Sequence, residues 1–170
     1  MFKLDFSKEE VCIYRYDNGD CKYTGFTDTE ELGEIIDQFT QGADYELQYM
    51  DGELSGRATN DPFQIYLVAE EQQTPLYIVN TLYNYYGDII DIENIIKYDK
   101  YYSWWGSSEL DAFQGFCEEC GITSQYPQEI RDYFDYEKYY HDLECSGGFR
   151  VLKTDKTNLD QAEYLIIFEY

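Results

Sequence analysis

The feature that most constrains the folding of this chain is its charge. Thirty-five Asp and Glu residues face twelve Lys and Arg residues, which gives a formal net charge of −23 over 170 residues. Such repulsion favours disorder in chains with few apolar residues, but here 44% of the residues are hydrophobic and 19% are aromatic. The chain therefore has enough apolar material for a packed core, and it folds at an electrostatic cost. This surface predicts a strongly basic partner, most often one built to bind nucleic-acid phosphates.

The charge also matches that of DNA over the size of a small domain. Duplex DNA carries one charge per ~1.7 Å of its axis, so the net charge equals that of roughly 39 Å of duplex. A compact domain of this length has a radius of gyration near ~15 Å and therefore a similar diameter. Carboxylates along one extended face can present a DNA-like charge density. A merely solvated, solubilising surface is the alternative interpretation.

Composition and motifs bound the class of protein. No apolar run approaches the ~18 residues that a membrane span needs, and the N-terminal segment lacks a signal-peptide core. We therefore expect a cytoplasmic protein, and the negative charge disfavours anionic membranes as partners. An odd number of cysteines without a secretory signal indicates reduced thiols; these are Cys12, Cys21, Cys117, Cys120 and Cys145.

Residues 1–60 are expected to form a small sheet with one helix. A hairpin is predicted over 11–16 and 21–26, with a two-residue turn at Asn18-Gly19. That register pairs Tyr16 with Cys21, Tyr14 with Tyr23, and Cys12 with Gly25, so Cys12 and Cys21 are not cross-strand partners.

A helix and a third strand are expected to follow this hairpin. Residues 27–29 offer N-caps for the helix, whose apolar positions, Leu32, Ile35, Ile36 and Phe39, recur at helical spacing. Gly42 is expected to end the helix. The alternation over residues 45–50 predicts the strand, which stops at 51–52.

Residues 61–106 are expected to form a mostly helical, acidic subdomain. Residues 63–69 fit either a strand or a helix. Pro75 suits the first helical position, and Leu76, Val79, Leu82 and Tyr83 then form one apolar stripe that ends at Gly87. Residues 91–98 indicate another helix, and 100–105 are strand-like. Between Tyr23 and Ile96, Arg57 is the one basic residue against fifteen Asp and Glu.

Residues 107–170 are expected to combine helices with an antiparallel strand pair. Ser107 or Ser108 caps a helix that Gly121 closes. Pro127 opens a further helical segment to residue 133, a helix over 136–143 follows, and 149–153 and 164–170 form the strand pair. The predicted fold class is α+β, an elongated chain of small subdomains that mix short antiparallel sheets with helices.

The sequence gives little support for catalysis or metal binding. Cys117, Cys120, His141 and Cys145 have a spacing that could supply four zinc ligands. However, Cys117 falls on the apolar stripe of a helix, and small buried thiols are common in cores. Any nucleophile–histidine pair would depend on His141, the single His. We expect no enzymatic activity, no cofactor and no metal, and a zinc-dependent enzyme ranks last.

The last 65 residues resemble the ArdA antirestriction family. The similarity lies in Ser108-Glu109-Leu110, Gly121, the run from Pro127 to Tyr136, Tyr139-Tyr140-His141-Asp142-Leu143, a Gly-Gly-Phe turn and Phe168-Glu169-Tyr170. Weaker similarities run through the rest: Phe26-Thr27, Asp44-Tyr45-Glu46-Leu47 and Ile92-Glu93-Asn94-Ile95-Ile96. The order and the total length suit a whole-chain relationship. The family's antirestriction segment corresponds to residues 82–96, where only the Ile-Glu-x-Ile-Ile part matches.

This resemblance implies a DNA mimic: an anti-defence protein of a mobile element or phage, acting as a homodimer in the host cytoplasm. It implies that the protein occupies the DNA groove of type I restriction-modification enzymes and blocks restriction, without binding nucleic acid itself. The alternatives are inhibition of another nucleic-acid-binding defence complex, of the CRISPR type, and a chaperone-like protein that shields a basic partner.

The carboxylates expected to imitate phosphates lie on the predicted helices and at their ends: Asp28, Glu30, Glu31, Glu34, Asp37, Glu70, Glu71, Asp88, Asp91, Glu93, Glu109, Asp111, Glu118 and Glu119. Ile122 and Tyr126 are the expected dimer contacts, because they are apolar side chains between two helices with no obvious helix face to join.

Overall fold

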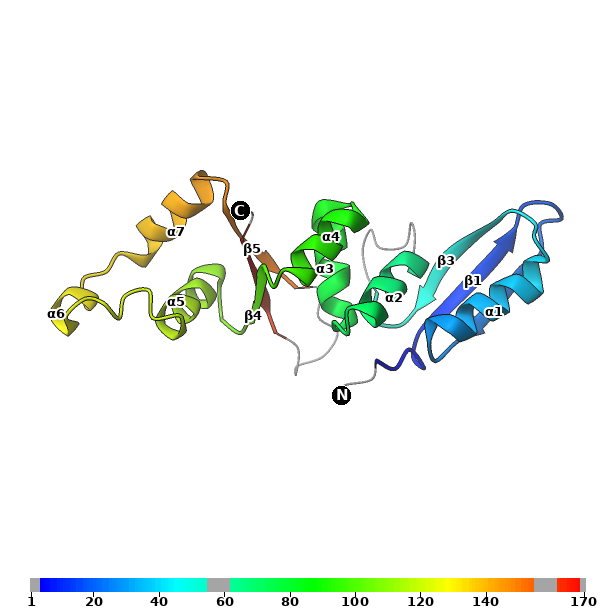
Figure 1. Ribbon diagram of the computed structural model, residues 1–170, viewed down its shortest axis with the longest axis horizontal. Helices are drawn as coiled ribbons and strands as arrows, with labels where there is room; N and C mark the ends of the chain where they lie inside the picture. Colours follow the sequence, from blue (N-terminus) through cyan, green and yellow to red (C-terminus); the bar gives the residue numbers. More distant parts are fainter. Residues whose placement is uncertain (1–3, 55–61, 155–161, 169–170) are drawn as a thin grey trace. The chain divides into compact units, whose positions relative to one another are not determined.

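The computed structural model describes residues 4–54, 62–154 and 162–168 (Figure 1). The chain is α+β, and it divides into two compact units, Met1–Ile96 and Lys97–Tyr170. Each unit contains a three-stranded antiparallel sheet. The predicted mixture of small subdomains with short antiparallel sheets and helices is confirmed. Arg57 and the last two residues of the expected strand 164–170 lie outside the described residues.

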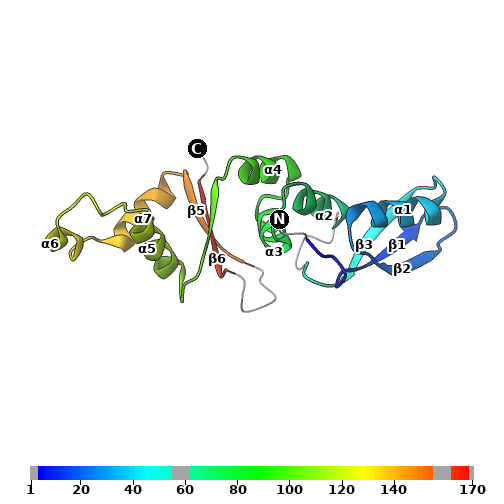
Figure 2. The same cartoon turned by 60° about the horizontal axis from the view of Figure 1, so that its bottom comes forward.

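The sheet of the first unit has the order β2-β1-β3, from β1 (Glu10–Arg15), β2 (Cys21–Gly25) and β3 (Tyr45–Asp51). Helix α1 (Thr29–Thr40) lies along one face of this sheet (Figures 1 and 2). Val11 and Ile13 of β1 are fully buried, as is Leu32 of α1. The core of this part therefore lies between α1 and the sheet. The alternation of apolar residues in the strands and their helical spacing in α1 predict this arrangement.

The hairpin forms, but its predicted register is wrong. Tyr14 lies opposite Cys21 and Cys12 opposite Tyr23. The Arg15 N–H donates to the Asp20 carbonyl (2.9 Å), so residues 16–19 all belong to the loop. The pairing moves by two residues, and each side chain stays on its predicted face. Cys12 and Cys21 are not directly opposite one another, as predicted.

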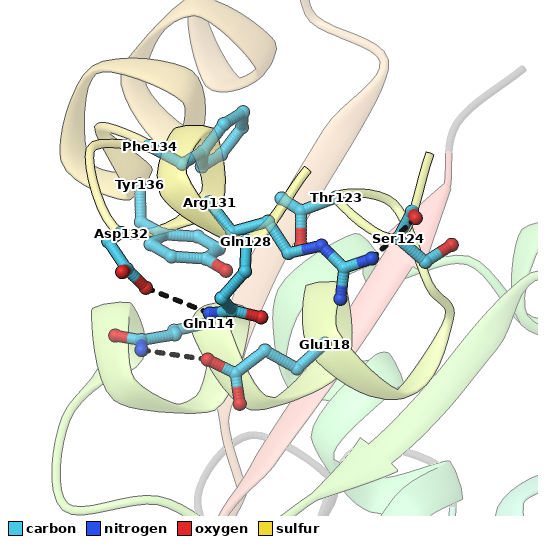
Figure 3. A pocket seen from close by; sticks show the side chains of 9 residues that line it. All are labelled: Gln114, Glu118, Thr123, Ser124, Gln128, Arg131, Asp132, Phe134 and Tyr136. Carbon is cyan, nitrogen blue, oxygen red and sulfur yellow. Dashed lines mark hydrogen bonds between the residues drawn. The ribbon is translucent and has the colours of Figure 1, made fainter. Parts of the chain in front are cut away.

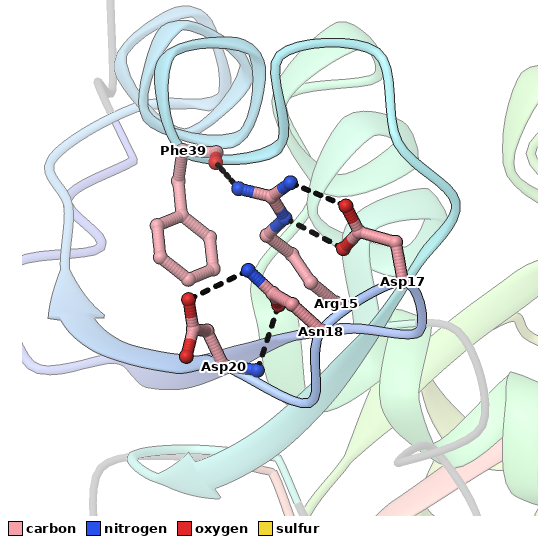
Figure 4. Close-up of polar contacts among 5 residues, drawn as sticks. All are labelled: Arg15, Asp17, Asn18, Asp20 and Phe39. Carbon is pink, nitrogen blue, oxygen red and sulfur yellow. Dashed lines mark hydrogen bonds and ion pairs between the residues drawn. The ribbon is translucent and has the colours of Figure 1, made fainter.

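Arg15 explains the longer loop (Figure 4). Its guanidinium donates to both carboxylate oxygens of Asp17, at 3.0 and 2.6 Å, and to the Phe39 carbonyl at the end of α1, at 3.1 Å. The Asn18 side chain contacts Asp20 twice, accepting from its N–H at 2.9 Å and donating to its carboxylate at 2.7 Å. These side-chain bonds favour the loop over a two-residue turn.

Three helices complete the first unit: α2 (Pro62–Glu71), α3 (Leu76–Tyr86) and α4 (Ile89–Lys97). Residues 63–69, which fit a strand or a helix, are helical. Pro75 is the N-cap of α3 instead of its first helical residue, and Gly87 ends α3 with a φ of 71°, as predicted. Every residue from Leu76 to Leu82 is buried. The single apolar stripe predicted for this helix is therefore too narrow.

The sheet of the second unit has the order β4-β6-β5, from β4 (Tyr101–Trp104), β5 (Phe149–Lys153) and β6 (Tyr164–Phe168). The predicted pair β5–β6 is antiparallel, with Val151 opposite Ile166. The strand-like segment 100–105 becomes β4, the third strand of this sheet. Residues 164–167 of β6 are all buried, which their unbroken apolar run favours for a central strand.

Helices α5 (Glu109–Glu119), α6 (Gln128–Arg131) and α7 (Tyr136–Cys145) complete the second unit. Phe113, Phe116 and Cys117 of α5 form a buried cluster with Phe149 of β5 and Ile166 of β6. Helix α5 approaches β4 closely at Gly115, where a Cβ atom would meet the Trp104 indole nitrogen at 2.5 Å. A larger residue at position 115 would separate the helix from the sheet.

The first unit has a buried carboxylate at Glu9. Glu9 is 2% exposed and accepts hydrogen bonds from the Tyr66 hydroxyl at 2.9 Å and the Glu53 N–H at 2.7 Å. A Cβ atom at Gly52 would collide with this carboxylate, and Gly52 has a φ of 133°, which also favours glycine. Burial raises the pKa of Glu9, and Glu53 and Asp51 add to the rise. Burial and the Glu9 charge also raise the pKa of Tyr66, and that of Tyr49 to about 12.

Glu9→Gln should make the free energy of unfolding less dependent on pH. Because the folded pKa of Glu9 lies above its ordinary value of 4.5, its ionisation opposes folding. Stability is therefore lost as the pH rises from 4.5 through the folded pKa. Gln can still accept from the Glu53 N–H and can donate to the Tyr66 hydroxyl oxygen. The advantage of the variant over the wild type should be smallest below pH 4.5 and largest at pH 7.

Urea unfolding followed by far-ultraviolet circular dichroism measures this difference at each pH. Glu10→Gln, at the exposed neighbouring position, is the control for the loss of one negative charge. A stability difference between Glu9→Gln and wild type that is constant with pH would contradict the assignment.

Candidate partner-binding surface

Helix α1 presents the clearest set of unengaged carboxylates. Glu30, Glu34 and Asp37 are exposed, and within the described residues none of their carboxylates takes part in a hydrogen bond or an ion pair. Their spacing of four and three residues places them on one side of the helix, about 6 and 4.5 Å apart along its axis. One strand of DNA carries a charge every ~3.4 Å. One helix is therefore less densely charged than DNA, and a DNA-like surface requires carboxylates from several elements.

Two of the predicted carboxylates on α1 stabilise the helix itself. Asp28 is the N-cap, and its side chain accepts from the Glu31 N–H at 2.9 Å. Glu31 in turn accepts from the Thr27 N–H at 2.7 Å and from the Thr27 hydroxyl at 2.9 Å. This reciprocal arrangement is a capping box displaced by one residue. Both charges also lie at the positive end of the helix dipole.

The end of α2 supplies one structural and one unengaged carboxylate. Glu70 is half-buried and accepts from the Thr29 N–H at 3.0 Å and from the Thr29 hydroxyl. It therefore joins α2 to the first turn of α1. Glu71 is exposed and has no hydrogen-bond or ion-pair partner within the described residues.

Helix α4 repeats this division. Asp88 precedes the helix and accepts from the Ile90 N–H at 2.8 Å, which stabilises the first turn. Asp91 is exposed and Glu93 is half-buried, and neither has a hydrogen bond or ion pair to another described residue. This helix lies in the segment that the resemblance assigns to antirestriction.

Helix α5 engages three of its four predicted carboxylates. Asp111 accepts from the Ser107 N–H at 2.7 Å, and these bonds from the Ser107 backbone and hydroxyl lower the pKa of Asp111. Glu109 accepts from the Tyr140 hydroxyl at 3.3 Å; burial, together with the Glu109 charge, raises the pKa of Tyr140 to about 12. Glu118 accepts from the Gln114 amide at 2.9 Å. Glu119 is exposed and, among the described residues, has no such partner.

The structure thus sorts the predicted carboxylates into two groups of equal size. One group caps helices or accepts local hydrogen bonds: Asp28, Glu31, Glu70, Asp88, Glu109, Asp111 and Glu118. The other group has no hydrogen-bond or ion-pair partner within the described residues: Glu30, Glu34, Asp37, Glu71, Asp91, Glu93 and Glu119. We call this second group the free carboxylates.

The residues weighed as zinc ligands are not gathered by the fold. Cys117 is fully buried in the core, and burial raises its pKa to about 12, whereas Cys120 is exposed. His141 and Cys145 lie one turn apart on α7, with the thiol sulfur 3.6 Å from Nε2. Within the described residues, no three His, Cys, Asp or Glu side chains are grouped so that they could hold a metal ion.

The two expected dimer contacts differ in their surroundings. Ile122 is half-buried and packs against the aromatic cluster of the second unit. Tyr126 is 41% exposed, and it is followed by Ile130 at 53% and Tyr133 at 88%. Apolar side chains are therefore available around α6, but Ile122 already has contacts within its own chain.

The sequence reasoning missed a polar pocket of about 600 Å³ beside α6. Two carboxylates line it, Glu118 of α5 and Asp132 just after α6, and each accepts from a Gln one turn earlier on its own segment (Figure 3). The Gln114 and Gln128 amides lie 2.9 and 2.8 Å from these carboxylates. The repeated Gln-x-x-x-acid spacing was the available signal.

The chain matches no protein-family model and no curated protein sequence. In the part of the chain that the structure describes, no helix has both the length and the apolar character to cross a membrane.

Asp28→Ala should reduce the free energy of unfolding by about 1 kcal/mol, because the cap of α1 is lost. Asp28→Asn should lose less, because the amide oxygen can still accept from the Glu31 N–H. Glu30→Gln, at a free carboxylate in the first turn of the same helix, should change stability by no more than about 0.5 kcal/mol. Urea unfolding compares the three variants, and equal losses for Asp28→Ala and Glu30→Gln would refute the sorting of these carboxylates.

Proposed function

We propose that the protein is a DNA-mimicking anti-defence protein that occupies the DNA groove of type I restriction-modification enzymes and blocks restriction. The observation that carries this proposal is the set of free carboxylates, which are charged side chains that the fold does not use. The net charge of −23 and the resemblance to the ArdA antirestriction family support it. The reaction is a binding event, and no catalytic group takes part.

The physical basis is the replacement of phosphates by carboxylates. Lys and Arg residues that line a DNA channel meet the carboxylates of Glu30, Glu34 and Asp37 on α1. They also meet the free carboxylates of α4 and α5, which are Asp91, Glu93 and Glu119. When a protein binds real DNA, it releases counterions that are condensed on the phosphates. This release is less favourable at high salt, so salt weakens the binding of DNA. A folded protein carries fewer condensed counterions, so the mimic competes best where salt weakens DNA binding. Steering between opposite charges makes the association fast.

Titration of the purified protein into a type I DNA-cleavage assay tests the proposal. Cleavage should fall to a plateau at a fixed ratio of inhibitor to enzyme, because each inhibitor molecule occupies one groove. One copy that disables many enzyme molecules would contradict mimicry and indicate an enzyme. Inhibition of a CRISPR-type nuclease but not of a type I enzyme would transfer the function to that other target.

Joint substitution of Glu30, Glu34 and Asp37 by their amides should weaken inhibition about tenfold. Exposed ion pairs contribute about 0.5 kcal/mol each, and about 1.4 kcal/mol corresponds to a factor of ten. Each single substitution should therefore reduce inhibition by about twofold. The inhibitor concentration at half-maximal cleavage measures both effects.

The matched control replaces Glu129, Asp142 and Glu144, three exposed carboxylates outside the predicted set. It removes the same charge and should weaken inhibition much less. An equal loss in the control would show that total charge matters and the α1 surface does not. Complete loss through one of the single substitutions, with folding intact, would indicate a discrete site instead of a distributed one.

We further propose that the protein acts as a homodimer through the second unit. Two strongly negative subunits require a mainly apolar contact, and the exposed side chains around α6 offer one at Tyr126, Ile130 and Tyr133. Raised salt should strengthen the dimer by screening the repulsion.

Ile130→Asp should dissociate the dimer, because it places a charge in the apolar contact. Ile130 is 53% exposed, so its substitution does not disturb the core, whereas Ile122 packs against the core cluster. Sedimentation velocity at micromolar concentration measures the oligomeric state at low and raised salt, and Gln125→Asp in the preceding exposed loop is the control. A monomeric wild type in physiological salt would contradict the proposal.

A further inference from the structure

The pocket beside α6 is a candidate site for a cation. It has a volume of about 600 Å³ and lies within the second unit, between α5, α6 and the segment that joins them. Oxygen acceptors dominate its polar lining: Glu118, Asp132, Gln114, Gln128, Thr123 and Tyr136 (Figure 3). Each carboxylate has one oxygen bonded to a Gln amide, at 2.9 Å for Glu118 and 2.8 Å for Asp132. The second carboxylate oxygens and the two amide oxygens remain available.

Arg131, the basic residue that lines the pocket, does not neutralise these carboxylates. Arg131 donates from Nε to the Tyr126 carbonyl at 2.8 Å and from Nη2 to the Ser124 carbonyl at 2.6 Å. Figure 3 shows its guanidinium drawn toward Ser124, away from Asp132. No ion pair joins it to Glu118 or Asp132, although the structure describes all three residues. The backbone carbonyls thus hold the arginine back from the acidic end of the pocket.

A threonine hydroxyl at the pocket is also available to a ligand. Thr123 is 5% exposed and lines the pocket, and its hydroxyl has no hydrogen-bond partner within the described residues. Its oxygen points toward α5 in Figure 3, on the side where Glu118 and Gln114 lie. This hydroxyl can accept a hydrogen bond from a ligand that donates one.

The shape of the lining favours a planar, delocalised cation. Tyr136 contributes an aromatic ring beside Asp132 (Figure 3), and Phe134, whose ring lies 4.8 Å from that of Tyr136, also lines the pocket. Aromatic faces attract guanidinium groups. Guanidinium carries five N–H donors in a fixed plane, which match several separated oxygen acceptors. A divalent metal ion fits less well, because within the described residues no group of three His, Cys, Asp or Glu side chains could hold one.

We propose that this pocket binds the guanidinium group of an arginine side chain from the basic partner. The assignment of the source rests on the proposed function, which requires a surface rich in Lys and Arg. Glu118 and Asp132 bind the N–H edge, Tyr136 and Phe134 contact the flat face, and Thr123 accepts one further hydrogen bond. The pocket adds a discrete anchor to an otherwise distributed surface.

The direct test uses Nα-acetyl-arginine amide as the probe in a titration followed by ¹H–¹⁵N NMR. Backbone resonances of Thr123, Gln128 and Asp132 should shift together and saturate. Nα-acetyl-citrulline amide, which has the same shape without the charge, should cause no saturating shift. The double variant Glu118→Gln/Asp132→Asn should bind the arginine probe at least about tenfold more weakly, because it loses two charge-assisted contacts.

Glu119→Gln is the matched control, since it removes an adjacent exposed carboxylate of α5 that does not line the pocket. It should bind the probe as the wild type does. Equal binding of citrulline, or equal weakening by Glu119→Gln, would overturn the guanidinium site. The ¹H–¹⁵N spectrum of each free variant shows whether it is folded.

The same variants in the cleavage assay separate the site from the function. Inhibition that falls at least about fivefold in the double variant, and by no more than about twofold in Glu119→Gln, whose carboxylate belongs to the distributed surface, supports an arginine of the partner as the occupant. Full inhibition by the double variant would overturn the anchor and leave the proposed function intact. Binding of the probe by a protein that inhibits no nuclease would retain the guanidinium site and overturn the partner as its source.

Discussion

Repulsion between carboxylates has to be offset within each unit, because each unit has its own acidic surface and its own core. Aromatic side chains supply much of the compensation. In the first unit the Tyr66 ring lies 5.2 Å from Phe6 and 4.9 Å from Phe26, between centroids. In the second unit Phe113 lies 5.1 Å from Phe149. Such pairs add about 0.5–1.5 kcal/mol beyond the burial of their area, and the high aromatic content thereby offsets part of the repulsion.

The carboxylates themselves are divided between two uses. Those at helix N-termini satisfy N–H groups that have no partner within the helix, and they interact favourably with the helix dipole. Neither α1 nor α5 has a basic residue in its last turn, although that is where a cation would be most favourable. At these two helices the favourable charges within the helix are the carboxylates of the N-terminal end, and at the end of α1 the Phe39 carbonyl accepts instead from Arg15 of β1.

Local patterns predict most elements of this fold, because caps and hydrophobic periods act over a few residues. Asp28, Ser108 and Gly87 end or begin helices as the sequence indicates. The hairpin register differs from the predicted one because side-chain bonds within the loop, from Arg15 to Asp17 and between Asn18 and Asp20, act together with the bond from Arg15 to the distant Phe39 carbonyl. The width of the buried face of α3 and the role of Glu9 also depend on distant partners. The sequence identified which residues are acidic, but only the contacts distinguish capping carboxylates from free ones.

The close approach of α5 to β4 at Gly115 has a spectroscopic consequence. Trp104, whose indole lies against that glycine and 6.4 Å from the Phe116 ring, and Trp105 are the two tryptophans of the chain. Both belong to the second unit, while the first has none. Fluorescence excited at wavelengths that tryptophan absorbs and tyrosine does not therefore reports on the second unit alone, and tyrosine absorbance reports on both units. The order in which the two units lose their structure can be followed in a single sample, without a label.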